Sequence, residues 1–100
     1  MADFANRLNQ LRERFLERLA CDLRQIEEIA AGEPSVEQLE CLQHVAHRLA
    51  GISGSIGYPD VSRAALALDR EWNPSGAVVA ELRAKVEVLR DAAGKHLPMP

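Results

Sequence analysis

Aromatic residues are scarce in this chain, and it lacks both long apolar runs and an excess of basic charge. Phe, Trp and Tyr make up 4% of the 100 residues, although 47% are hydrophobic. The core must therefore come from Leu, Ile, Val and Ala, which favours helices over a β-sandwich. The 12 Lys and Arg against 15 Asp and Glu give a formal charge of -3, which argues against a nucleic-acid-binding protein.

No stretch approaches the roughly 18 to 20 apolar residues of a membrane span, and the chain does not begin with a basic segment followed by an apolar run. We therefore expect a cytoplasmic protein with no membrane contact. The length corresponds to one domain over residues 1–100, with 98–100 as a flexible tail. Cys21 and Cys41 lack the close spacing of a zinc or redox motif, and we interpret them as reduced thiols in the core or at its boundary.

Residues 4–31 contain no Gly or Pro, and their apolar residues advance by threes and fours, which predicts one long amphipathic helix. A helix of this length exceeds what a compact domain of 100 residues needs, so its first turns either bend away or overhang. Gly32-Glu33-Pro34 ends it, and Ser35 with Gln38 has the form of a capping box for the next helix. The apolar stripe comprises Phe4, Leu8, Leu11, Phe15, Leu19, Leu23, Ile26 and Ala30.

Three further amphipathic helices follow in the pattern. The second ends near Gly57-Tyr58-Pro59, the third runs from a cap at Asp60 toward Trp72 and Asn73-Pro74, and the fourth begins with a cap at Asn73 or Ser75 and ends at Gly94. Short connections between four such helices predict an all-α fold, an antiparallel up-down four-helix bundle with a long N-terminal helix. Its core is self-contained, so a monomer is the default expectation.

The second helix carries a histidine and two glycines on the face opposite its apolar stripe. At about 100° per residue, His47 falls about 150° from the centre of that stripe and faces solvent. Gly51 and Gly54 flank the same direction, although each costs about 0.5 to 1 kcal/mol relative to Ala in a helix. Either the stretch frays or admits a neighbouring helix, or side chains are absent so that another macromolecule can reach the imidazole.

An exposed histidine can act as a base, a metal ligand or a nucleophile. A convex helix face offers neither the pocket nor the orienting carboxylate of an acid-base catalyst. Cys41, His44 and His47 drift about 60° round the helix at each step, so they do not converge on one metal ion. His44 is interpreted as a surface or rim histidine, and His96 carries no signal.

Residues 47–57, HRLAGISGSIG, resemble the signature of histidine-containing phosphotransfer (HPt) domains, roughly H-x-L-K-G-x-x-x-x-x-G. With the flanking helices, the resemblance covers essentially the whole chain. It implies that His47 accepts a phosphoryl group from the aspartate of one receiver domain and passes it to another. It also implies that Gly51 leaves space beside the histidine. Ala50 departs from the Lys usual in the family, and Arg48 is its nearest substitute in sequence.

The resemblance implies a phosphoryl carrier with no kinase activity and no cofactor, because the chain has neither a nucleotide loop nor a carboxylate cluster for Mg²⁺. The Mg²⁺ is expected on the receiver domain. The expected partners are receiver domains of a hybrid histidine kinase and of a response regulator, contacting His44, Arg48, Gly51, Gly54 and Ser55. Two alternatives stay open, namely an unphosphorylated docking module that binds receivers and a purely structural bundle.

Overall fold

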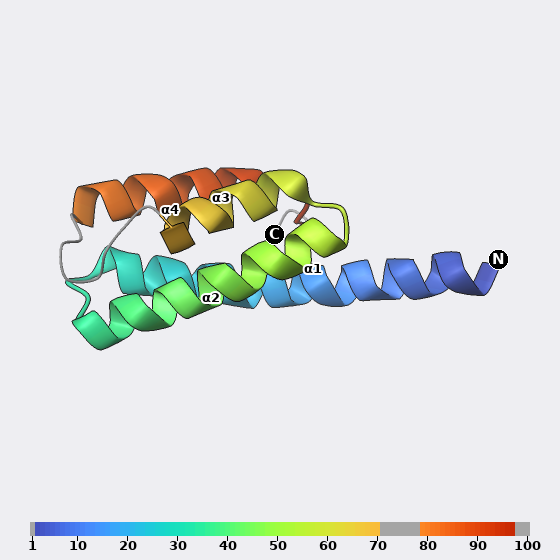
Figure 1. Ribbon diagram of the computed structural model, residues 1–100, viewed down its shortest axis with the longest axis horizontal. Coiled ribbons are helices and arrows are strands. Elements are labelled where there is room, and N and C mark those ends of the chain that lie inside the picture. Colours follow the sequence, from blue (N-terminus) through green and yellow to red (C-terminus); the bar gives the residue numbers. More distant parts are fainter. Residues whose placement is uncertain (1, 71–78, 98–100) are drawn as a thin grey trace.

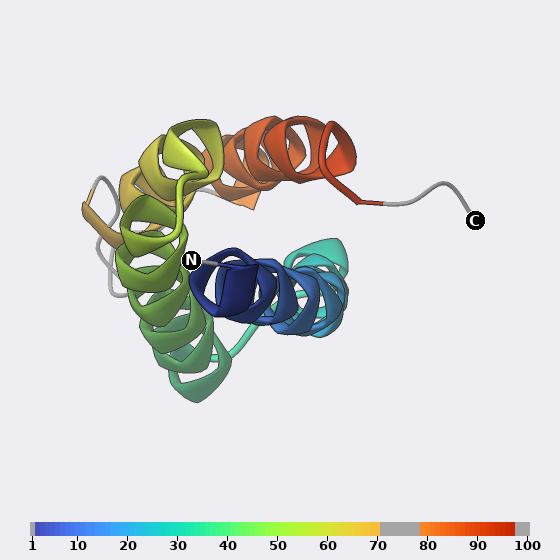
Figure 2. The ribbon, with the colours of Figure 1, turned by 90° about the vertical axis from the view of Figure 1, so that its right-hand side faces the viewer.

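The computed structural model describes residues 2–70 and 79–97, which form four α-helices and no strand. Successive helices run in opposite directions, with α1 and α3 each packed against both α2 and α4 (Figures 1 and 2). The predicted all-α bundle with a long first helix is confirmed. No helix among the described residues is long and apolar enough to cross a bilayer. The helices are α1 (Ala2–Ala31), α2 (Val36–Ser55), α3 (Pro59–Arg70) and α4 (Val79–Gly94).

The signals for helix ends agree with the structure where it describes them, except that Asp60, predicted to cap the third helix, lies inside the first turn of α3, which begins at Pro59. The Ser35 hydroxyl accepts a hydrogen bond from the backbone N–H of Gln38 at 3.2 Å, and the Gln38 side chain accepts one from the Ser35 backbone N–H at 2.9 Å. The predicted capping box is therefore confirmed. After α2, Gly57 turns the chain with a φ of +95°, a conformation that favours glycine. The expectations for residues 71–78 and for the 98–100 tail lie outside the described residues.

The core follows the predicted stripes except at the start of α1. Phe4 and Leu11 leave 74% and 53% of their surface exposed, so the apolar stripe is not buried over the first turns of α1. The first turns of α1 extend straight past the ends of α2 and α4 (Figure 1), and no helix lies there to cover them. Cys21 and Cys41 are free and exposed, which contradicts a position in the core. The buried apolar residues of α1 are Phe15, Leu19, Leu23, Ile26 and Ala30.

A cluster of rings joins the end of α4 to the start of α3. The ring of Tyr58 stacks on Phe15 at 5.3 Å and meets the edge of His96 at 4.7 Å. His96 Nε2 donates to the Asp60 carboxylate at 2.9 to 3.0 Å. This hydrogen bond from His96 lowers the pKa of Asp60 below its ordinary value. His96, which carried no signal in the sequence, thus helps to hold the last helix in place.

The carboxyl end of α1 has no basic residue in its last turn and is capped instead from α4. Arg83 donates through Nε to the carbonyl of Ala30 at 2.9 Å, and through Nη2 to those of Ala31 at 3.2 Å and Gly32 at 3.4 Å. These carbonyls belong to the unsatisfied groups at a helix end, where a cation is favourable. One side chain therefore fixes α1 to α4.

We expect Arg83→Met to lower the free energy of unfolding by about 1 to 2 kcal/mol, because it removes charged hydrogen bonds while keeping a good helix former. Urea unfolding measures this change. Arg90→Met is the matched control, since Arg90 lies 3.7 Å from an exposed Glu87 on the same helix, and it should change the value by less than about 0.5 kcal/mol. Equal losses in the two variants would contradict the capping role.

Candidate functional site

His47 lies near the middle of α2 with 75% of its side chain exposed, as the helical wheel predicts. Its ring is not free, however. Nδ1 lies 2.8 Å from Oδ2 of Asp69 in the last turn of α3. The expectation that no carboxylate orients this histidine was therefore wrong, because α3 packs alongside α2 and carries an acidic residue to the ring.

Asp69 is itself fixed to α2. Its side chain is only 19% exposed, and its backbone carbonyl accepts a hydrogen bond at 2.8 Å from Nε2 of Gln43, one turn before His47. Asp69 thus forms contacts with two successive turns of α2. Sequence reasoning missed it, and the available signal was an acidic residue beside the buried stripe of the third helix.

The hydrogen bond between His47 and Asp69 decides which ring nitrogen is reactive. An ionised carboxylate only accepts hydrogen bonds, so Nδ1 of His47 carries the proton and donates it. In the neutral ring, the lone pair then resides on Nε2, at the exposed edge. The arrangement presents a nucleophilic nitrogen to solvent with the ring orientation set from behind.

The two glycines after His47 occupy different surroundings. A Cβ built on Gly51 meets nothing within 4 Å, whereas a Cβ on Gly54 would lie 3.2 Å from Oγ of Ser62 on α3. Ser62 in turn donates a hydrogen bond to the carbonyl of Ala50 at 2.8 Å. Gly54 therefore permits a close approach of α3 as well as lying at the surface, while Gly51 leaves open space beside the histidine.

Ala50, at the position where the family signature has Lys, is buried, with 7% of its surface exposed. Ala64 and Ala65 of α3 belong to the same core. A longer side chain here must pass along α3 before it reaches solvent. Ala50 serves helix packing in this chain.

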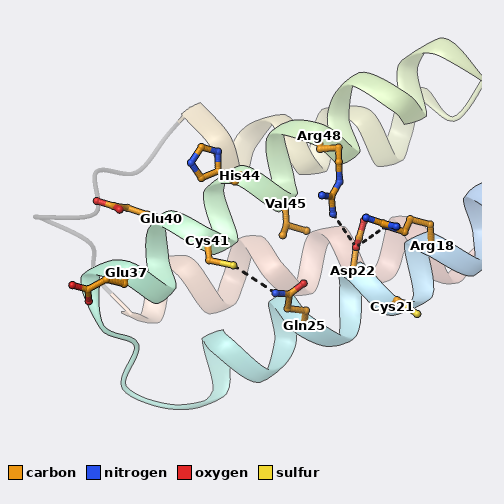
Figure 3. Close-up of a pocket in the computed structure, with 10 residues that line it drawn as sticks. All are labelled: Arg18, Cys21, Asp22, Gln25, Glu37, Glu40, Cys41, His44, Val45 and Arg48. Atoms are coloured by element: carbon orange, nitrogen blue, oxygen red, sulfur yellow. Dashed lines mark hydrogen bonds and ion pairs between the residues drawn. The ribbon is translucent and has the colours of Figure 1, made fainter.

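Arg48 points away from His47. Its Nη2 lies 3.2 Å from Oδ1 of Asp22 on α1, an oxygen that also lies 3.5 Å from Nε of Arg18. Figure 3 shows the Arg48 side chain reaching from α2 toward Asp22, which is only 5% exposed. A buried carboxylate needs such partners. This contact places the Arg48 guanidinium on the α1 side of α2, not beside the imidazole.

The other predicted contact residues stay near the surface. His44 is exposed, and Figure 3 shows its ring pointing away from Asp22. The Ser55 hydroxyl donates to the carbonyl of Gly51 at 3.0 Å. The Cys41 thiol points toward Gln25 on α1 and His47 toward α3, so Cys41, His44 and His47 do not converge. Within residues 2–70 and 79–97, no group of three His, Cys, Asp or Glu side chains is placed to hold a metal ion.

A family model described as the Hpt domain matches residues 10–92, most of the chain. The chain belongs to this family. Hpt domains are histidine phosphotransfer modules of phosphorelays, act as phosphocarriers and interact with receiver domains. Neither the curated proteins nor the solved structures gave a match.

The two glycines should respond differently to alanine. Gly51→Ala should raise the free energy of unfolding by about 0.5 to 1 kcal/mol, because it improves helix propensity in open space. Gly54→Ala should lose that gain, since its Cβ would press on Ser62. Urea unfolding of both variants tests this, and Ser62→Ala combined with Gly54→Ala should recover stability. Equal effects of the two single substitutions would show that α3 does not approach Gly54 closely.

Proposed function

We propose that His47 is the phosphoacceptor of this Hpt domain. It receives a phosphoryl group from the aspartyl phosphate of one receiver and delivers it to the aspartate of another. The observation that carries the proposal is the hydrogen bond from Nδ1 of His47 to Asp69, which leaves Nε2 as an exposed nucleophile. Gly51 beside it leaves room for a partner's active site.

In the forward step, the Nε2 lone pair of His47 attacks phosphorus, and the bond from phosphorus to the donor's carboxylate oxygen breaks with its electron pair. The donor aspartate leaves as a carboxylate. The phosphorylated ring keeps its proton on Nδ1 and acquires positive charge, which the Asp69 carboxylate stabilises. In the next step an acceptor aspartate attacks phosphorus, and the N–P electron pair returns to Nε2.

The residues of this chain orient the His47 ring, but they do not supply all of the stabilisation that the charged phosphoryl oxygens need. Arg48 is paired with Asp22 on the far side of α2, and Ala50 is buried. The phosphoryl oxygens are therefore expected to be stabilised by the receiver, which contributes Mg²⁺ and its own cations. Preorganisation of the nucleophile is the contribution assigned to this domain.

Labelling tests the acceptor directly. Receiver domains charged with radioactive acetyl phosphate should transfer acid-labile label to the wild-type chain and to His44→Gln, but not to His47→Gln. His44 is the matched control because it is an exposed histidine on the same helix, one turn earlier. Label on His47→Gln but not on His44→Gln would be decisive against His47. Receiver binding with no transfer would favour the docking-only module. The buried Ala50 and the Arg48 paired with Asp22 are consistent with that alternative, because neither places a cation beside His47.

Asp69 is proposed as a positioning residue, and Asp69→Asn should slow transfer about tenfold. A charge-assisted hydrogen bond contributes about 1.5 to 3 kcal/mol, with the lower value appropriate at an exposed ring. Nitrogen NMR of the His47 ring should show protonated Nδ1 in the wild type and a mixture of tautomers in Asp69→Asn. Asp60→Asn, which removes the other carboxylate of α3 that pairs with a histidine, should leave both measurements unchanged. An unaltered tautomer in Asp69→Asn would disprove the role.

A further inference from the structure

Gln43 lies on α2 one turn before His47, on the side of the helix that faces α3. It is half-buried, and its Nε2 donates a hydrogen bond at 2.8 Å to the backbone carbonyl of Asp69. The carboxylate of the same Asp69 accepts a hydrogen bond from Nδ1 of His47, also at 2.8 Å. Gln43 and His47 therefore hold one residue of α3 at two points, its backbone and its side chain.

The carbonyl that Gln43 contacts belongs to the last turn of α3, which ends at Arg70. A helix leaves its last four carbonyls without a donor from its own backbone, and its ends fray. The Gln43 amide supplies a donor to one of these carbonyls from the neighbouring helix. Because Asp69 is the second-last residue of α3, fraying of this turn would also move its carboxylate. The hydrogen bond from Gln43 opposes that movement.

We propose that Gln43 is a positioning residue for phosphoryl transfer, which holds the Asp69 carboxylate where it keeps the proton of His47 on Nδ1. This role rests on the proposed function of His47 and adds a third residue to the pair that His47 forms with Asp69. A glutamine suits the task because its amide donates to a carbonyl while remaining uncharged. It therefore fixes the backbone of Asp69 without neutralising the carboxylate.

A purely structural role of Gln43 predicts a different behaviour. If the hydrogen bond only capped α3, its loss would lower the free energy of unfolding and leave the His47 ring unchanged. If it positions Asp69, its loss changes the tautomer of His47, because a neutral imidazole without a fixed acceptor carries its proton on either nitrogen. A ring with the proton on Nε2 lacks the exposed lone pair that attacks phosphorus.

Nitrogen NMR of the neutral His47 ring distinguishes these two roles. Gln43→Met removes the donor but keeps the length of the side chain and a good helix former, and it should shift part of the ring population from protonated Nδ1 to protonated Nε2. Gln25→Met is the matched control, because Gln25 also contacts a neighbouring helix, donating to Sγ of Cys41 at 3.5 Å on the α1 side of α2. It should leave the His47 tautomer unchanged.

A second variant restores the donor. Gln43→Lys places an ammonium group, which only donates hydrogen bonds, within reach of the Asp69 carbonyl, and it should return most of the ring population to protonated Nδ1. Circular dichroism checks that each variant is folded. A wild-type tautomer in folded Gln43→Met would overturn the proposal and leave Gln43 as a helix cap. Failure of Gln43→Lys to restore the tautomer would exclude the lost donor as its cause.

Transfer kinetics test whether Gln43 acts through Asp69. Gln43→Met should slow the labelling of His47 by a phosphorylated receiver about threefold, because the lost hydrogen bond is uncharged and does not touch the ring. Asp69→Asn keeps the backbone carbonyl but lacks the carboxylate, so adding Gln43→Met to it should cause no further slowing. An equal further loss would show that Gln43 acts independently of Asp69 and would overturn the proposal.

Failure of the proposed function is distinguishable from failure of the role of Gln43. Label on His47→Gln would reject His47 as the phosphoacceptor. The tautomer measurement needs no phosphoryl donor, so it decides separately whether Gln43 holds Asp69 against the His47 ring.

Discussion

The close approach of α2 and α3 is the constraint on which the site depends. Gly54 has no Cβ where Ser62 passes, and Ser62 donates to the carbonyl of Ala50 across the same contact. This packing fixes the position of α3 along the axis of α2. The last turn of α3 therefore brings Asp69 within 2.8 Å of the His47 ring. The absence of a Cβ at Gly54 thus fixes the position of a carboxylate about two turns farther along α3.

Two neighbouring residues of α2 are directed to opposite sides by two carboxylates. Asp69 holds His47 on the α3 side, and the buried Asp22 holds Arg48 on the α1 side. Breaking the Asp22 contact would leave a buried charge without its partner, which is strongly unfavourable. Arg48 therefore costs more to move than an exposed arginine does. The Asp22 contact therefore keeps Arg48, the cation next to His47 in the sequence, away from the imidazole.

The sequence predicts features that depend on local chemistry and misses those that depend on how helices meet. The cap of Ser35 with Gln38, the end of α2 before Gly57 and the outward direction of His47 follow from neighbouring residues, and all agree with the structure. Asp69 is 22 residues from His47, and no periodicity specifies the register between two helices.

A helical wheel also treats Gly51 and Gly54 alike, because it represents one helix without the helices that pack against it. Only the position of α3 shows that Gly54 meets Ser62 and that Gly51 meets nothing within 4 Å. The same reasoning explains the start of α1. Periodicity places Phe4 and Leu11 on the same stripe as Phe15, yet burial requires a partner helix, and α2 and α4 end first. An apolar pattern thus specifies a face that a neighbouring helix can cover, and the lengths of the other helices decide how far it is covered.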